Sequence, residues 1–309
     1  IAGEYESYDI RGAYSLSALD KNEGSENNPD TLLNAGAGSW LSHARNSFRS
    51  LIAGVSYRGS LASGNNTIEW GLAARQRSYD SFRNEWLRVD SAGYTPGRKD
   101  DGLTLSSRTF LGNETRSFTT EGWLISRTRF TVSGRACDLN AGIRASYDTY
   151  GSELLISPRV SLRSELTRAF SVYLAAGAYH QPPEGRELIG EDGESGFHPR
   201  AQRSYHLTAG TRYEFTAWDR PFRFTAEAYG KLFDRLIPYR ADNVRLIYYG
   251  GNIAEGYTIG IDMRVNGEFV PGVESWFSMS LMKSELRIPE LSTGLYPAPF
   301  DQRVHFSIF

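Results

Sequence analysis

Long apolar runs are missing from this sequence of 309 residues. No stretch reaches the roughly 18 apolar residues that a membrane-spanning helix requires, and the mean hydropathy is −0.44. A helical membrane protein is therefore excluded. The single cysteine, Cys137, cannot form an internal disulfide and says little about the redox compartment. The net charge is small, at −2, so the protein has no overall positive charge that would attract nucleic acid.

A signal peptide is also missing, because Ile1–Tyr5 has neither a charged start nor an apolar core. We expect that processing or truncation has removed whatever preceded this point. The histidines are scattered and show no metal-ligand spacing. They are His43, His180, His198, His206 and His305. We expect each of them to make an ordinary hydrogen bond in the lumen or at the rim of the fold, and we predict neither a metal site nor a cofactor.

What is present is a repeated alternation, clearest in residues 152–183. The even positions of its first half are apolar: Leu154, Ile156, Pro158, Val160 and Leu162. Polar residues take most of the odd positions, and this period of two is typical of a strand with one apolar and one polar face. The alternation resumes after Leu166-Thr167-Arg168, so two long antiparallel strands joined by a tight turn are predicted. Each approaches the roughly 9–11 residues that cross a bilayer at a tilt.

The same alternation predicts about twelve strands along the chain. They cover residues 5–16, 50–61, 68–86, 118–132, 137–148, 154–165, 170–181, 205–215, 222–231, 257–269, 277–281 and 304–308. The strand at 118–132 has the least regular pattern, because Trp123 and Ile125 are out of phase with their apolar neighbours. The apolar faces almost wholly lack charge, as expected if an Arg or Lys at mid-bilayer costs roughly 2–4 kcal/mol.

Long and short connections alternate between these strands. We expect long polar loops at 18–46, 90–115, after Pro182, at 238–252 and at 288–300, with short turns between them. Bacterial outer-membrane barrels have short turns on the periplasmic side and long loops outside, whereas β-sandwiches and propellers have no such requirement. The predicted fold class is therefore all-β, an antiparallel transmembrane β-barrel. Leu166-Thr167-Arg168 is assigned to the periplasmic side and Gln181-Pro182-Pro183 to the start of an extracellular loop.

Several segments together resemble the TonB-dependent outer-membrane transporters. The segments, in family order, are NEW at 84–86 with DSAGY at 90–94, LNAGIRASYD at 139–148, SPRVSL at 157–162, AGAYHQPP at 176–183, TAEAY at 225–229, GYTIGID at 256–262 and PFDQR at 299–303. Their shared order over most of the chain carries the resemblance.

The resemblance implies a barrel of 22 strands preceded by a plug and a TonB-contacting segment. We expect residues 1–309 to be part of that barrel, without the plug and with both ends inside the wall. It further implies active transport of a scarce or bulky substrate, such as a nutrient, a metal chelate or an oligomer, across the Gram-negative outer membrane. Implied partners are outer-membrane lipid, TonB acting through the plug, and a substrate-binding surface lipoprotein.

Two sets of residues are candidates for function. Charged residues expected to face the lumen are candidates for the substrate path or for plug contacts, with solvated lumen lining as the equal alternative: Arg144, Arg159, Arg163, Arg212, Glu227, Asp262 and Arg264. Residues of the loop after Pro182 are candidates for an extracellular surface: Gln181, Glu184, Arg186, Glu187, Glu191, Asp192 and Glu194. Their order does not match a calcium loop, so a solvated loop is favoured over a cation site.

Two other functions stay open. A complete twelve-stranded barrel hydrolase resembling an outer-membrane phospholipase predicts pairing between the first strand near Tyr8 and the last near Phe306, although no diagnostic catalytic spacing is present. A soluble all-β binding domain predicts that the apolar face of Leu139–Tyr147 is buried against a second sheet.

Overall fold

The computed structural model describes residues 2–20, 31–90, 104–188, 198–242, 245–289 and 294–309. These residues form a 13-stranded antiparallel sheet and a separate two-stranded sheet. The large sheet contains β1 (Ala2–Asp20), β2 (Thr31–Ser63), β3 (Asn66–Asp90), β4 (Thr104–Val132), β5 (Arg135–Asp148), β6 (Glu153–Glu165), β7 (Phe170–Gln181), β8 (Gln202–Ala217), β9 (Arg220–Leu236), β12 (Ala254–Val270), β13 (Val273–Arg287), β14 (Tyr296–Pro297) and β15 (Val304–Ile308). The small sheet contains β10 (Tyr239–Asp242) and β11 (Arg245–Tyr248), and η1 (Gly185–Leu188) is a short 3-10 helix.

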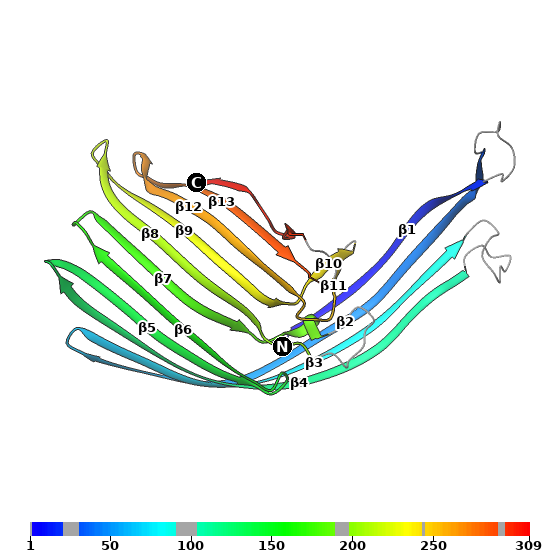
Figure 1. The fold of residues 1–309 in the computed structure, drawn as a ribbon, viewed down its shortest axis with the longest axis horizontal. Coiled ribbons are helices and arrows are strands. Elements are labelled where there is room, and N and C mark those ends of the chain that lie inside the picture. The colour runs from blue at the N-terminus through cyan, green and yellow to red at the C-terminus, as the bar shows by residue number, and fades with distance from the viewer. Residues whose placement is uncertain (1, 21–30, 91–103, 189–197, 243–244, 290–293) are drawn as a thin grey trace. The chain divides into compact units, whose positions relative to one another are not determined.

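The strands of the large sheet pair in chain order from β1 to β9 and then through β12 to β13 (Figure 1). Both β14 and β15 pair with β13. Apart from the two-residue β14, the described residues thus contain the predicted twelve sheet strands. Among these residues no helix has the length and apolar character needed to cross a membrane. The prediction of an all-antiparallel fold is confirmed.

Three of the predicted loops are wrong in part, since the loop predicted at 238–252 contains β10 and β11. Residues 31–46 belong to β2, where Thr31 pairs with Asp20 and Asn46 pairs with Glu6, and residues 104–115 belong to β4. Backbone groups form the ladder whatever the side chains are, and neither segment shows a strict alternation of apolar and polar residues. Residues 21–30 and 91–103, the remainder of each interval between strands, lie outside the described residues.

The alternation of long and short connections is not strict. Residues 149–152 join β5 to β6 in a tight turn, at a place where strict alternation requires a long loop. Phe118 and Thr149 bind this turn to β4, since each backbone N–H donates to the other residue, at 2.9 and 3.0 Å. The turns at Gly64, Gly134 and Gly272 are short as predicted, and each places glycine at a positive φ of 55–76°, which only glycine adopts without strain.

The strands divide between two compact units. Unit 1 comprises Ile1–Ile52 and Arg77–Arg116, and unit 2 comprises Ala53–Gln76 and Ser117–Phe309. In unit 1 the ring of His43 stacks on Trp86 with 4.7 Å between ring centroids, and its Nδ1 lies 2.6 Å from Asp9 Oδ1. Arg45 binds the same aspartate at 3.1 Å. These contacts join β1, β2 and β3 within the unit.

In unit 2 the apolar faces of the strands are exposed. Leu154 is 65% exposed, Leu174 52% and Leu207 57%. The face of Leu139–Tyr147, which the soluble alternative places against a second sheet, is also open, with Ile143 48% and Tyr147 43% exposed. An exposed apolar face that extends over so many strands is stable in contact with lipid. The prediction of the soluble all-β domain is therefore wrong.

The irregular pattern of β4 has a structural cause. Trp123 lies over Gly71, where a side-chain Cβ would come within 2.5 Å of the indole. The guanidinium of Arg58 lies over the same ring, 5.8 Å from its centroid. A large aromatic residue therefore occupies the polar face of the sheet, which obscures the alternation in the sequence.

The apolar band ends differently at its two edges. Near the short turns, Phe222 is 4% exposed and packs against Phe215, Trp218 and Phe269, with 5.1–5.7 Å between ring centroids. At the other edge the same face carries the ion pair of Glu255 and Arg287. On β8 the apolar face runs from Tyr205 to Phe215, close to the roughly 9–11 residues that a tilted strand needs to cross a bilayer. Aromatic residues are typical of such boundaries.

Ile261 lies in the middle of this band and is 45% exposed. We expect Ile261→Arg to lower the free energy of unfolding by about 2–4 kcal/mol, because the charge is placed in the hydrocarbon. The matched control is Val270→Arg beside the Gly272 turn, where the expected cost is about 0–1 kcal/mol. Denaturant titration of the protein folded in lipid vesicles measures both values. Equal costs at the two positions would contradict the assignment of the band.

The hydrolase alternative requires β1 to pair with β15. In the sheet order of the described residues β1 pairs with β2, and β15 pairs with β13. The pairing that this alternative predicts is therefore absent from the described part of the chain.

Candidate functional site

The polar face of unit 2 carries one row of side chains that runs across neighbouring strands. Period two places each residue on this face, and the strand register aligns them. The polar row comprises Arg129, Asp138, Arg163, Tyr173, Gly210, Glu227, Asp262, Ser280 and His305. Three of the predicted lumen residues thus lie in register.

Five of the seven predicted lumen residues line one hollow of about 500 Å³, the Glu227 hollow. They are Arg163, Arg212, Glu227, Asp262 and Arg264, and the rest of the lining includes serines of β7 and β13. Tyr173 donates its hydroxyl hydrogen bond to Glu227. The ring of Tyr173 fits there because residue 210 is glycine, where a Cβ would lie 2.4 Å from the ring.

The charges in the Glu227 hollow are held in different ways. Arg264 lies over the ring of Trp276, 4.7 Å from its centroid, and Arg212 forms an ion pair with Glu214 at 2.5 Å. Asp262 has a buried carboxylate oxygen with no hydrogen-bond partner. An unsatisfied buried oxygen is costly, so Asp262 is held by the register of β12 rather than by a hydrogen bond to this oxygen.

The other two predicted lumen residues lie elsewhere on the same face. Arg144 forms an ion pair with Glu121, and Arg75 binds the second oxygen of that carboxylate at 2.9 Å. Arg159 lies over the ring of Tyr179, 4.4 Å from its centroid. Sequence reasoning missed Glu121 and Tyr179, although the parity of their positions in the strands is the signal that identifies their face.

Glu187 holds the described start of the loop that follows β7, residues 182–188, in place. Its carboxylate accepts a hydrogen bond from the Glu184 backbone N–H and another from Gln202 Nε2, both at 3.0 Å. Gln202 Oε1 in turn accepts from the Ile237 backbone N–H at 3.2 Å. Gln181 ends β7 and pairs with Gln202 in the ladder. The loop after β7 is thereby joined to the segment after β9.

Four of the predicted loop residues remain to be placed. Arg186 lies in η1, whereas Glu191, Asp192 and Glu194 lie outside the described residues. No group of three or more His, Cys, Asp or Glu in the described part of the chain is arranged to hold a metal ion.

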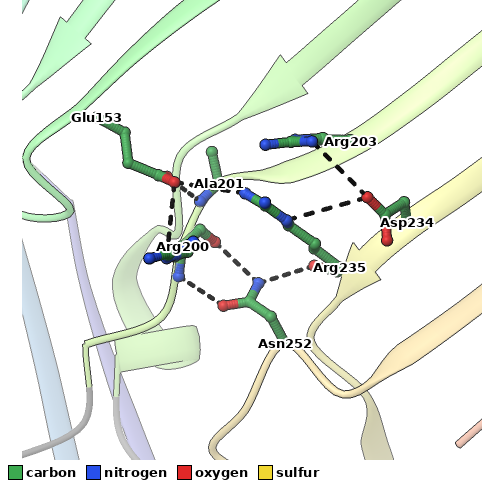
Figure 2. Close-up of polar contacts among 7 residues, drawn as sticks. All are labelled: Glu153, Arg200, Ala201, Arg203, Asp234, Arg235 and Asn252. Atoms are coloured by element: carbon green, nitrogen blue, oxygen red, sulfur yellow. Dashed lines mark hydrogen bonds and ion pairs between the residues drawn. The ribbon is translucent and has the colours of Figure 1, made fainter.

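A second polar network lies at the start of β6 and β8 and at the end of β9 (Figure 2). Glu153, at the start of β6, accepts from the Ala201 backbone N–H at 2.7 Å and lies 3.5 Å from Arg235 Nη1. Asn252 Nδ2 donates to the carbonyls of Arg200 and Arg235 at 2.8 and 2.7 Å, and Asn252 Oδ1 accepts from the Arg200 N–H. These contacts join loops that are far apart in the sequence, and sequence reasoning missed them.

Apolar residues of the connections after β7 and β9 are also buried. They are Leu188, Pro199, Ala201, Ile237, Ile247 and Ala254, each at most 9% exposed. The hairpin of β10 and β11 is held by Tyr239 and Tyr248, whose ring centroids are 5.7 Å apart. Burial raises the pKa of Tyr248, and the nearby charge of Glu187 raises it further, which places η1 close to the hairpin. We use the name loop platform for the described residues between β7 and β8 (182–188 and 198–201) and between β9 and β12 (237–242 and 245–253), together with Glu153.

One serine and one histidine lie together as in a hydrolase. Ser157 Oγ is 3.0 Å from His180 Nδ1. Ser157 is only 6% exposed, and no carboxylate of the described residues hydrogen-bonds His180. A nucleophile needs access and a base oriented by a third group, so this pair does not support hydrolysis.

Comparison with known proteins gives a family model and several structures. The model described as TonB dependent receptor-like, beta-barrel matches residues 3–291. Similar solved structures include the outer membrane transporter YddB from Escherichia coli, at 13% identity and a TM-score of 0.45. They also include the pyoverdine outer membrane receptor FpvA from Pseudomonas aeruginosa PAO1 bound to pyoverdine, at 12% and 0.48, and the copper transporter OprC, at 10% and 0.50.

These three matches cover 81%, 99% and 82% of this chain but only 34%, 44% and 42% of the solved chains. The chain therefore spans less than half the length of these structures. At such identities the likeness concerns the fold alone. No curated protein sequence matches the chain.

The loop platform should depend on Asn252. Replacing it by alanine removes its three hydrogen bonds to the backbone of Arg200 and Arg235. We expect the free energy of local opening at Ala201 to fall by about 1–3 kcal/mol, because backbone groups lose their partners. Hydrogen exchange of the Ala201 amide measures this change. Asn266→Ala in β12 is the matched control and should leave exchange at Ala201 unchanged; an equal loss in both variants would contradict the assignment.

Docking of η1 should depend on pH through Glu187. Burial raises the pKa of Glu187 above its usual 4.5. The docked loop therefore binds the proton more tightly than the open loop, so docking is strongest below the usual pKa and weakens as the pH rises through the raised value. Hydrogen-exchange protection factors of residues 185–188, measured from about pH 4 to about pH 7, should fall with pH. Glu187→Gln should remove this dependence, and protection that rises with pH would refute it.

Proposed function

This chain belongs to the family of TonB-dependent receptor-like β-barrels, and from that membership we propose that it forms the barrel wall of an active transporter. The family is one of Gram-negative outer-membrane receptors and transporters rather than enzymes, and the chain is accordingly an outer-membrane protein. The proposed cargo is a substrate too scarce or too bulky for passive diffusion, such as a nutrient, a metal chelate or an oligomer.

The division of the sheet into two faces supports this proposal most directly. One face exposes apolar side chains on strand after strand, and the other carries the polar row. A wall between lipid and a wet or plug-filled interior requires this division. We propose that residues 1–309 are part of such a wall, in contact with outer-membrane lipid.

In the proposed mechanism the loop platform receives the substrate outside the cell. Glu184, Arg186 and Glu187 belong to the platform, which is ordered by Glu153 and Asn252 (Figure 2). A preformed platform loses little conformational entropy on binding, which favours capture of a dilute solute. A surface lipoprotein that delivers substrate would dock on this side.

The substrate then moves along the polar face. We propose that Arg163, Glu227 and Asp262 of the polar row contact either the substrate or a plug, and that Arg212 and Arg264 do so from the same hollow. TonB would supply the energy by moving the plug.

Uptake in the native host tests this function. We expect at least one solute of the growth medium to be depleted by wild-type cells, and this depletion to be lost both when the full-length gene is deleted and when TonB is deleted. Mass spectrometry of the medium measures depletion. Asn252→Ala in the full-length protein should weaken uptake at low substrate concentration by about tenfold, with Asn266→Ala as control. Depletion that persists without TonB would refute active transport.

A further inference from the structure

A second hollow on the polar face has a different chemical character from the first. It measures about 970 Å³ and is lined by residues of β4, β5, β6 and β7 and by the turn after β2. Its charged lining consists of four arginines and one aspartate: Arg127, Arg129, Arg159, Arg163 and Asp138. We call it the arginine hollow. Its size is at the upper end of the range of about 300–1,000 Å³ in which ligands bind.

Two of these arginines already have a carboxylate partner. Arg127 binds Glu69 at 3.0 Å, and Arg129 binds Asp138 at 2.8 Å. Arg159 and Arg163 form no ion pair with any carboxylate of the described residues. Arg163 donates to the Ser171 hydroxyl at 3.2 Å, and Arg159 lies on the Tyr179 ring. Two positive charges thus face the hollow without an ion-pair partner among the described residues, and Asp138, the carboxylate of this lining, is already bound to Arg129.

The geometry holds Arg159 in place. Residue 177 is glycine, and a Cβ there would come within 3.1 Å of Arg159 Cγ and of the Tyr179 ring. Tyr179 is in turn stacked on His206, with 4.3 Å between ring centroids. Stacking immobilises the guanidinium plane and leaves its N–H edge free for a ligand.

Neutral donors lie between the two arginines. Arg159 and Arg163 are four residues apart on one face of β6, which corresponds to about 13 Å. Ser161 lies between them and accepts a hydrogen bond from Asn140 at 3.2 Å. The residue opposite Ser161 on β7 is Ala175, whose small side chain leaves the hollow open between the two arginines.

We infer that the arginine hollow is a binding site for carboxylate groups, with Arg159 and Arg163 as the two anchoring cations. Guanidinium forks bind carboxylates in bidentate fashion, and such charge-assisted bonds are stronger than neutral ones. Two sources supply this chemistry: a small polycarboxylate solute on its way through the barrel, or acidic side chains of another part of the receptor. The inference rests on the proposed function in one respect: the hollow meets a solute or another part of the receptor only if the polar face lines the lumen of a barrel.

The test uses the purified full-length receptor in detergent and tricarballylate as the probe. If the carboxylates belong to a solute, calorimetry should show that tricarballylate binds and that added salt weakens binding. The double variant Arg159→Gln with Arg163→Gln should reduce the affinity by at least about tenfold. The matched control is Arg58→Gln, which removes an arginine that is also stacked on an aromatic ring but lies outside the hollow; it should bind tricarballylate like the wild type.

If the carboxylates belong to the receptor itself, the wild type should bind no tricarballylate, and the double variant should melt at a lower temperature than both the wild type and Arg58→Gln. Added salt should also lower the melting temperature of the wild type more than that of the double variant. Absence of both binding and a specific melting difference overturns the inference. Neither readout requires uptake, so a failure of the transport proposal would be distinguishable from a failure of this one.

Discussion

A strand that crosses lipid must have every backbone N–H and C=O paired within the protein, because the hydrocarbon offers no partner. The continuous ladder from β5 through β9 to β12 pairs each of these strands with a neighbour on both sides. Once the ladder is formed, successive side chains must point to opposite faces. The exposed apolar face, with Leu154 and Leu207, and the opposing polar row both follow from this single constraint.

The polar face is organised by rings and glycines as much as by ion pairs. Trp123 lies over Gly71, and Tyr173 lies over Gly210. Each glycine leaves room for a ring, and the Trp123 ring holds Arg58, which has no carboxylate partner among the described residues. Cation–π contacts of this kind hold a guanidinium without neutralising it. The wall therefore keeps uncompensated positive charge on the face that the proposed function turns toward the substrate.

In the loop platform, side chains rather than a strand ladder provide partners for the backbone groups. Glu153 and Asn252 satisfy backbone groups of two different loops, and Leu188 and Ile237 are buried beside them. Loops that pack on one another in this way lose much of their conformational freedom before any ligand arrives. The described parts of these loops are thus held together by residues at the start of β6 and after β9.

The sequence by itself determined the fold class, the faces of most strands and the place of Glu227 and Asp262 on the polar face, because period two is a local property of the chain. It did not determine that 31–46 and 104–115 continue as strands, because these segments lack a strict alternation of apolar and polar residues and their ladder depends on a partner strand. Nor did it determine that Arg163 lines two hollows, or that Asn252 joins two loops. Those facts depend on register and on contacts between distant residues, which only the tertiary structure decides.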